Sequence, residues 1–131
     1  GEMSRLTGLS RDEILRNREG IAQSFARKNG CVLVLKGAGT IVAGPHGPSA
    51  VNITGNPGMA SGGTGDVLTG LIAGFLAQGL KPAAAARLGV YVHGAAGDRA
   101  AEKVGQISLI ASDLIEAVSL ILKELFQRPL N

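Results

Sequence analysis

The run Gly62-Gly63-Thr64-Gly65-Asp66 is the strongest chemical signal in the sequence. It closes a glycine-rich segment, residues 54–65, that leads directly into an apolar helix expected to start near Asp66. The first N–H groups of a helix have no partner inside the helix, and glycines let an anion approach them without meeting a Cβ atom. The pattern therefore predicts an anion hole for phosphate, formed by Gly63, Thr64 and Gly65.

Asp66 would lie in the first turn of that helix, where the helix dipole favours an ionised carboxylate. A carboxylate there can face a transferring phosphate and take the proton of a substrate hydroxyl. Phosphoryl transfer through a loose transition state needs a well-placed acceptor more than a strong base. From spacing alone, a structural Asp after a flexible loop is an equally good interpretation.

Two familiar phosphate motifs do not occur in this sequence. No Gly-x-x-x-x-Gly-Lys-Ser/Thr run is present, and the Gly63-x-Gly65-x-x spacing ends on Leu68 rather than on glycine. The glycine-rich segment is therefore neither a P-loop nor a dinucleotide-binding fingerprint.

The composition predicts one compact domain that binds a small molecule. The 131 residues are 45% hydrophobic and 18% charged, which excludes a disordered tail. Aromatic residues make up only 3%, so a stacking surface for single-stranded nucleic acid is poorly supplied. The thirteen Lys and Arg residues are scattered along the chain and exceed the ten Asp and Glu residues by three, which gives a formal net charge of +3. We expect a phosphate-bearing small molecule as ligand and no nucleic acid.

Neither a membrane span nor a disulfide framework is expected. The longest apolar run, Val67 to Leu80, is interrupted by glycines and polar residues and is shorter than the roughly 20 residues that a bilayer span needs. We expect no signal peptide before it, and a single cysteine, Cys31, cannot form an internal disulfide. We expect a cytoplasmic protein without a membrane partner.

The elements that would position the glycine-rich loop can be read from periodicity and turn residues. The sequence predicts a helix from Ser10 to Asn29, capped by Ser10 and Glu13 and stopped by Asn29-Gly30. It also predicts a continuous apolar strand, Cys31 to Leu35, that is buried on both faces. Such a strand indicates an α/β fold with a parallel or mixed sheet. The predicted strands are Cys31 to Leu35, Thr40 to Ala43 and Ala50 to Ile53. Three helices are predicted after the loop: the first ends at Gln78-Gly79, the second runs from Pro82 to Val104-Gly105, and the third starts with Ser112 as its cap.

Several other residues have plain structural interpretations. Lys36 follows a strand and could balance phosphate charge, or be a solvated lysine. His93 is interpreted as a packed or capping residue, and with His46 in a Pro/Gly turn it does not make a zinc site. The spacing of Gly70 and Gly74 predicts close approach of another helix or strand.

Four segments together closely resemble the ADP- or ATP-dependent NAD(P)H-hydrate dehydratases, a family of the ribokinase-like superfamily. They are Gly1 to Leu6, Lys36 to Thr40, Asn56 to Gly70 and His93 to Asp98. The resemblance covers nearly the whole chain in order, and the Asn56 to Gly70 block distinguishes these enzymes from sugar kinases. It implies a ribokinase-like three-layer α/β/α sandwich, of which residues 1–131 look like the C-terminal half of a single longer domain.

The resemblance also implies an activity and the roles of particular residues. Members are hydro-lyases that use ADP or ATP with Mg²⁺ to convert the S form of hydrated NADH or NADPH back to the working cofactor. By the family's pattern Asp66 takes the hydroxyl proton and contacts the hydrate, Gly65 belongs to the nucleotide-binding anion hole, and Glu2 matches an acidic position near the magnesium. The adenylate-contacting loop is matched by Lys36, Gly37, Ala38, Gly39 and Thr40.

In the family, the segment that resembles Gly1-Glu2-Met3 is preceded by a His-Pro pair and by the sheet-forming first half of the domain. The present sequence starts at Gly1, so we expect the N-terminal half of the same domain as its partner. The resemblance further implies association into a homo-oligomer.

Two other functions stay open at this point. One is a small-molecule hydroxyl kinase of the same superfamily, such as the thiazole or pyrimidine kinases of thiamin synthesis, which share the anion hole and the Asp. The other is a non-catalytic nucleotide-binding module, or one subunit of a split domain. The Asn56 to Ala60 run and the Lys36 to Thr40 loop favour the dehydratases as a set.

Overall fold

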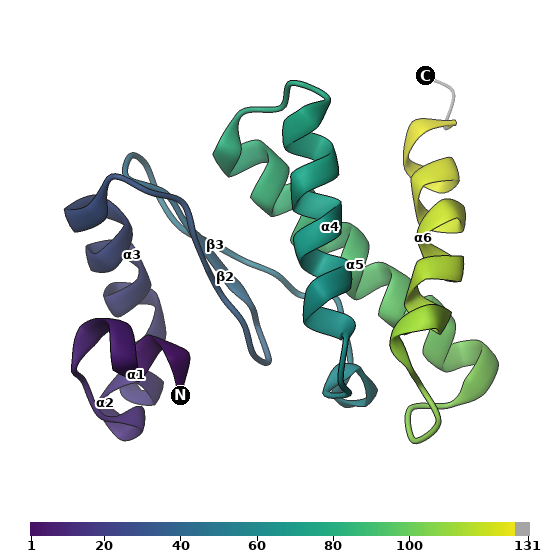
Figure 1. The fold of residues 1–131 in the computed structure, drawn as a ribbon, viewed down its shortest axis with the longest axis horizontal. Coiled ribbons are helices and arrows are strands. Elements are labelled where there is room, and N and C mark those ends of the chain that lie inside the picture. Colours follow the sequence, from purple (N-terminus) through teal and green to yellow (C-terminus); the bar gives the residue numbers. More distant parts are fainter. Residues whose placement is uncertain (128–131) are drawn as a thin grey trace. The chain divides into compact units, whose positions relative to one another are not determined.

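The computed structural model describes residues 1–127, and the chain divides into two compact units, Gly1–Asn52 and Ile53–Asn131. The first unit begins with the helices α1 (Glu2–Thr7), α2 (Arg11–Arg16) and α3 (Arg18–Asn29) (Figure 1). The predicted capping box is confirmed, because the Glu13 amide donates to Ser10 Oγ and the Ser10 amide donates to Glu13 Oε2. Gly30 ends α3 in a left-handed conformation, as the sequence predicts.

The prediction of one continuous helix from Ser10 to Asn29 is wrong, because the chain breaks at Asn17. Its backbone lies outside the helical region, with φ −146° and ψ 54°. The Asn17 side chain accepts a hydrogen bond from the Gly20 amide and so caps the start of α3. The apolar spacing continues across Asn17 and favours one helix. A short polar side chain that bonds a nearby amide offers the backbone an alternative to the helical conformation, and at Asn17 this alternative is adopted.

The strands of the first unit are β1 (Leu33–Leu35), β2 (Ile41–Ala43) and β3 (Ala50–Val51). Within residues 1–127 they form one sheet in the order β1-β2-β3, with Val34 opposite Val42 and Val42 opposite Ala50. Both pairings are antiparallel, so the prediction of a parallel or mixed sheet is wrong for these strands. The connections are short loops, and a parallel neighbour needs a crossover of a dozen or more residues.

The central strand β2, rather than β1, is the fully covered one. All three residues of β2 are buried, whereas those of β1 are half-buried, which corrects the prediction of a first strand covered on both faces. Ala22 and Ala26 of α3 are completely buried against Ile41 and Ala43 of β2. Small side chains on the helix let its backbone lie close to the sheet.

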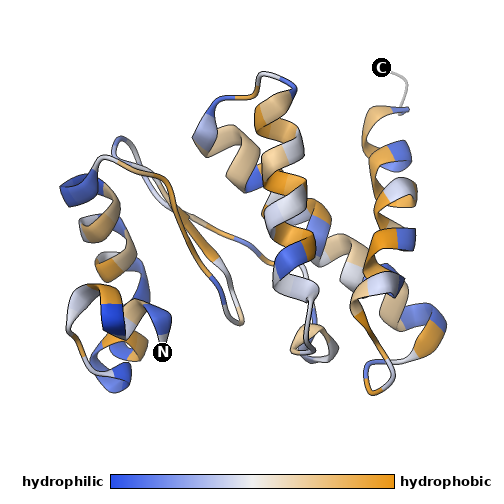
Figure 2. Cartoon of the chain, viewed as in Figure 1, coloured by the Kyte–Doolittle hydropathy of each residue, from blue (hydrophilic) through white to orange (hydrophobic). Residues whose placement is uncertain are grey.

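The second unit is helical, with the 3₁₀ turn η1 (Pro57–Met59) and the helices α4 (Thr64–Ala77), α5 (Pro82–Val104) and α6 (Ala111–Phe126). α5 contacts both α4 and α6 (Figure 1). In Figure 2 the hydrophilic residues of α6 lie on its outer side, away from α4. The shared core includes the buried side chains of Phe75, Val92, Leu109, Leu114 and Ile121.

The helix ends of this unit follow the sequence closely, with one correction at the start of α6. Pro82 is the first residue of α5 and Gly105 follows its end, as predicted. α6 starts at Ala111, where Asp113 Oδ2 accepts from the Ile110 amide at 2.9 Å, so the predicted Ser112 cap is wrong. A carboxylate three residues into the helix reaches back to a free amide.

The spacing of Gly70 and Gly74 does not mark a close approach within the described part of the chain. A Cβ atom added at either glycine would have no neighbour within 4 Å among residues 1–127. Close approaches lie instead at glycines of α5: Gly89 lies against Ile72 of α4, and Gly94 and Gly97 lie against the loop before α4. Among the described helices, none combines the length and the apolar character that a bilayer crossing requires.

Candidate functional site

The predicted anion hole is the first turn of α4, which starts two residues earlier than expected. Gly63 precedes the helix with φ +86°, a left-handed conformation that favours glycine. The Asp66 and Val67 amides donate to the Gly63 carbonyl at 3.1 and 3.2 Å. The amides of Thr64 and Gly65 precede this ladder and have no acceptor inside the helix. Gly63 has no side chain with which to cap them, so they are available to an external anion.

Asp66 occupies the third position of this turn and is exposed. Gly62 and Gly63 are also exposed, and Gly65 is partly so. The structure therefore brings together an uncapped helix start, a glycine-rich approach and a carboxylate, as the sequence predicts. The arrangement can bind an oxyanion and accept a proton beside it.

Thr64 connects the helix start to the preceding loop. Its side chain is 6% exposed, and its hydroxyl donates to the carbonyls of Met59 at 2.8 Å and Ser61 at 3.0 Å. One hydroxyl proton is shared between two carbonyl oxygens, and both carbonyls belong to the loop that precedes the anion hole. Thr64 thus fixes the loop through its side chain, in addition to presenting its amide.

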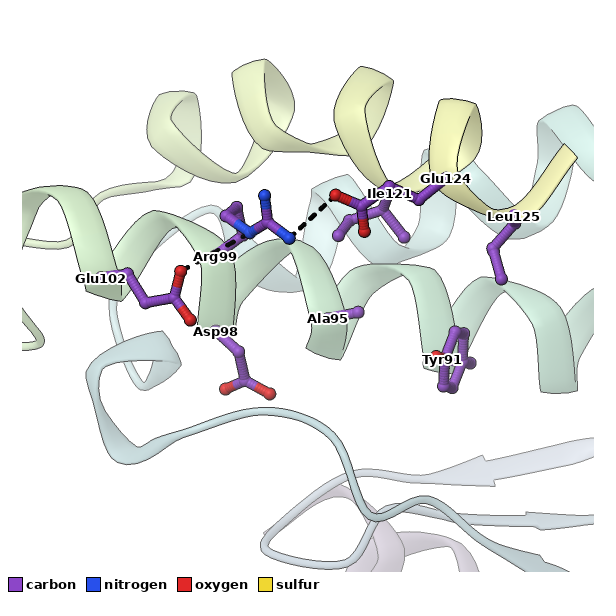
Figure 3. Close-up of a pocket in the computed structure, with 8 residues that line it drawn as sticks. All are labelled: Tyr91, Ala95, Asp98, Arg99, Glu102, Ile121, Glu124 and Leu125. Carbon is purple, nitrogen blue, oxygen red and sulfur yellow. Dashed lines mark hydrogen bonds and ion pairs between the residues drawn. The ribbon is translucent and has the colours of Figure 1, made fainter. Parts of the chain in front are cut away.

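The other end of the loop is held by Asp98 of α5. Its Oδ2 accepts from the Gly55 amide at 2.8 Å, and its Oδ1 accepts from Asn56 Nδ2 at 2.9 Å. Asn56 Oδ1 in turn accepts from the Gly58 amide at 3.1 Å and caps η1. Figure 3 shows Asp98 pointing from α5 toward the loop. One carboxylate therefore fixes both the backbone and the side chain at the loop's start.

The loop at residues 54–65 packs against the His93 to Asp98 segment of α5. On the helix surface, position 97 neighbours positions 93 and 94, and position 98 neighbours position 94. Gly94 and Gly97 are buried, and a Cβ at Gly94 would lie 2.8 Å from the Thr54 carbonyl carbon. A Cβ at Gly97 would lie 2.7 Å from Met59 Cε. The glycines are needed because the loop passes directly over the helix.

His93 contacts the anion hole itself. Its Nε2 atom lies 2.7 Å from the Thr64 carbonyl oxygen, in the first turn of α4. This confirms the interpretation of His93 as a packed or capping residue. Sequence reasoning identified the segment through the family resemblance alone and assigned no contact to His93 or Asp98.

The predicted adenylate loop, Lys36 to Thr40, is the turn that joins β1 to β2. Gly37 and Gly39 have φ +146° and +63°, which L side chains rarely adopt. Thr40 Oγ1 donates to the Gly37 carbonyl at 3.0 Å and closes the turn. Lys36, Gly37 and Ala38 are exposed and so accessible to a ligand.

Arg18 of α3 holds this loop, and sequence reasoning missed it. Its Nη1 donates to the Ala38 carbonyl at 2.6 Å, and its Nη2 lies 3.3 and 3.4 Å from the carbonyl oxygens of Leu35 and Lys36. A Cβ at Gly37 would be only 2.9 Å from Arg18 Nη2. Nothing near Arg18 in the sequence marks this role, because its partners lie 17 to 20 residues away.

Glu2, the predicted magnesium ligand, is exposed in the first turn of α1. Residues 1–127 contain no group of three or more His, Cys, Asp or Glu side chains placed to hold a metal. Mg²⁺ commonly binds through one or two carboxylates together with phosphate oxygens and water, so a lone carboxylate such as Glu2 fits that kind of site. Glu2 and the Lys36 to Thr40 loop belong to the first unit, and Gly63 to Asp66 belong to the second.

A shallow hollow of about 260 Å³ lies between α5 and α6 (Figure 3). Arg99 on its wall pairs with Glu124 at 2.8 Å and with Glu102 at 3.6 Å. None of the predicted site residues lines it. Asp98, on its rim, is already bound to the loop.

A family model described as NAD(P)H-hydrate dehydratase, within the carbohydrate kinase group, matches residues 1–120. The chain belongs to this family. The bifunctional NAD(P)H-hydrate repair enzyme of Moorella thermoacetica is 52% identical over 125 residues, which are 95% of this chain and 24% of that protein. The ADP-dependent (S)-NAD(P)H-hydrate dehydratase of Xanthomonas campestris is 39% identical over 125 residues, which are 95% of this chain and 43% of that protein.

Solved structures of this family have the same fold. The ADP/ATP-dependent NAD(P)H-hydrate dehydratase of Bacillus subtilis, co-crystallised with ATP and Mg²⁺, matches with a TM-score of 0.90 and 36% identity. That match covers 95% of this chain and 45% of the Bacillus chain. A ribokinase-like protein of Enterococcus faecalis matches with a TM-score of 0.80 and 35% identity, over 97% of this chain and 43% of that one. The chain is therefore ribokinase-like, and it spans about a quarter to less than half of the length of its dehydratase relatives.

Proposed function

We propose that this chain is part of an enzyme that uses ADP or ATP to dehydrate (S)-NAD(P)H-hydrate to NAD(P)H. The observation that carries the proposal is the first turn of α4, where uncapped amides of Thr64 and Gly65 stand beside the exposed carboxylate of Asp66. Membership of the dehydratase family supports it.

The chemistry requires a phosphate site next to a proton acceptor. Hydroxide is a poor leaving group, whereas phosphate leaves readily when the adjacent ring nitrogen supplies electrons. The enzyme phosphorylates the ring hydroxyl of the hydrate, and loss of phosphate then restores the double bond of the nicotinamide ring. The nucleotide supplies the phosphoryl group, and Mg²⁺ neutralises charge on the phosphates.

Each predicted residue has a distinct task in this proposal. The amides around Gly63, Thr64 and Gly65 bind phosphate oxygens, and Asp66 contacts the hydrate and takes its hydroxyl proton. Lys36, Gly37, Ala38, Gly39 and Thr40 contact the adenylate group, and Glu2 is the carboxylate that holds Mg²⁺. The exposed glycine turns at both loops leave room for a ligand close to the backbone.

We further propose that residues 1–131 form the C-terminal part of one larger ribokinase-like domain and act together with its N-terminal half. The 43% to 45% coverage of the dehydratase relatives supports this assignment. Association into a homo-oligomer stays a prediction from the resemblance, and a cytoplasmic setting stays a prediction from the cysteine usage of the sequence.

The test is Asp66→Asn in the whole protein, assayed by NADPH regeneration from the hydrate. Asn keeps the size and polarity of the side chain but cannot take the proton. Turnover is expected to fall by at least ~10²-fold, the lower bound for a positioned general base. Affinity for ADP or ATP is expected to stay level or rise, because a negative charge beside the phosphates is lost.

A purely structural Asp66 gives the opposite pattern, with a lower melting temperature and near wild-type turnover in the folded fraction. The matched binding variant is Gly65→Val, whose branched side chain would stand where a phosphate oxygen must lie. Unchanged nucleotide affinity in a folded Gly65→Val protein would remove this loop from the phosphate site. Accumulation of a stable phosphorylated product in the wild type would instead favour a hydroxyl kinase.

A further inference from the structure

His93 hydrogen-bonds to the peptide group that carries the Gly65 amide. Its Nε2 lies 2.7 Å from the carbonyl oxygen of Thr64. A carbonyl oxygen can only accept, so Nε2 must carry the proton and donate it. The Thr64 carbonyl and the Gly65 N–H belong to one planar peptide unit. A donor that fixes the carbonyl therefore fixes the direction in which the Gly65 N–H points.

This hydrogen bond also changes the strength of the amide as a donor. Hydrogen bonds in a chain polarise one another, so a donor on the carbonyl side makes the N–H of the same peptide unit a better donor. The Gly65 amide precedes the helix's own ladder and has no acceptor inside α4. The added polarisation is therefore directed toward an external acceptor.

The neighbours of His93 keep its backbone in place. Gly94 and Gly97 let α5 lie against Thr54 and Met59, and Asp98 binds Gly55 and Asn56. The loop is thus held at its start by Asp98 and at its end by His93, and both side chains belong to α5. The backbone that carries the His93 imidazole is therefore held in a fixed position beside the first turn of α4.

We propose that His93 is a positioning residue that orients and polarises the Gly65 amide for a phosphate oxygen of a nucleoside di- or triphosphate. The inference rests on the proposed function in one respect, that the first turn of α4 binds phosphate. It assigns His93 no contact with substrate and no part in proton transfer.

The test compares His93→Met with His93→Gln in the whole protein. The two side chains have similar length, but only Gln has an amide N–H that can replace Nε2 as donor. His93→Met is expected to weaken ADP binding roughly 2- to 10-fold, the range for loss of one hydrogen bond, and His93→Gln to restore most of it. His93→Asn, a polar side chain one carbon shorter, should behave like His93→Met. Lys103→Gln, at an exposed position on the same helix, is the control and should match the wild type.

A second measurement needs no ligand. The NMR chemical shift of the Gly65 amide should move in His93→Met and return toward the wild-type value in His93→Gln, at equal global stability, because the hydrogen bond to the Thr64 carbonyl polarises the same peptide unit. If the Met and Gln variants have the same ADP affinity and the same Gly65 amide shift, the inference is overturned. If Gly65→Val leaves ADP affinity unchanged, the phosphate site itself fails; a failure of the His93 role alone leaves the Gly65→Val effect intact.

Discussion

Replacing Thr64 by Val should destabilise the second unit more than replacing it by Ser. Val keeps the volume of the side chain but puts a methyl group where the hydroxyl donates to the Met59 and Ser61 carbonyls. Removal of the hydroxyl leaves two partly buried carbonyls without their donor, which costs about 1–3 kcal/mol. We expect Thr64→Val to lower the free energy of unfolding by an amount in this range, about 1–3 kcal/mol.

Thr64→Ser is the matched control, because it keeps the hydroxyl and loses only a methyl group. At a site that is 6% exposed, removal of one methyl costs about 0.5–1.5 kcal/mol. Hydrogen bonding and packing therefore predict opposite orders for the two variants. If packing dominates, Val is the milder change; if the hydroxyl dominates, Ser is.

Urea denaturation of the whole protein and its two variants measures this order, and titration with ADP measures the effect on the loop. The Val variant should also bind ADP more weakly, since the segment before the anion hole loses its connection to α4. A Thr64→Val protein at least as stable as Thr64→Ser would refute the reasoning.

Two further predictions concern the first unit. Arg18→Ala removes the donors to three carbonyls around the Lys36 to Thr40 loop and should weaken nucleotide binding, measured by calorimetry, by on the order of 1–2 kcal/mol. Arg18→Lys should recover little of this binding, because a single ammonium group cannot bond all three carbonyls. Full recovery by Arg18→Lys would contradict this role. Hydrogen bonds from the Ser10 hydroxyl and amide lower the pKa of Glu13 below the ordinary glutamate value of 4.5. The ionised Glu13 therefore stabilises the folded protein above pH 4.5, and this stabilisation is lost as the pH falls through the lowered pKa. The stability difference between the wild type and Glu13→Gln, followed by thermal unfolding from pH 7 to pH 3, should therefore shrink toward acid, and a constant difference would contradict it.

Features of the chain that depend on a few neighbouring residues were predictable. The capping box at Ser10 and Glu13, the glycine stops at Gly30 and Gly105, and the start of α5 at Pro82 all agree with the structure. Each involves groups no more than three or four residues apart, so the information is present in a short window. The helix start beside Asp66 was predicted for the same reason.

Features that depend on competition or on connection were predicted less well. Asn17 interrupts the helix although the apolar spacing favours continuity, because its side chain satisfies an amide that the helix would leave free. The direction of the strands follows from the short loops that join them, which forbid the parallel arrangement that the apolar run of β1 indicates. In both cases a local polar or steric constraint prevailed over hydrophobic patterning.

The residue types of the candidate site were evident before folding is considered: a run of glycines, free amides and a carboxylate in one helical turn. The side chains that hold them in place are visible only in the folded chain. His93 lies 29 residues from Thr64, Asp98 lies 43 residues from Gly55, and Arg18 lies 20 residues from Ala38. Such contacts form only when separate elements pack together, and no spacing rule within one element predicts which side chain will meet which carbonyl.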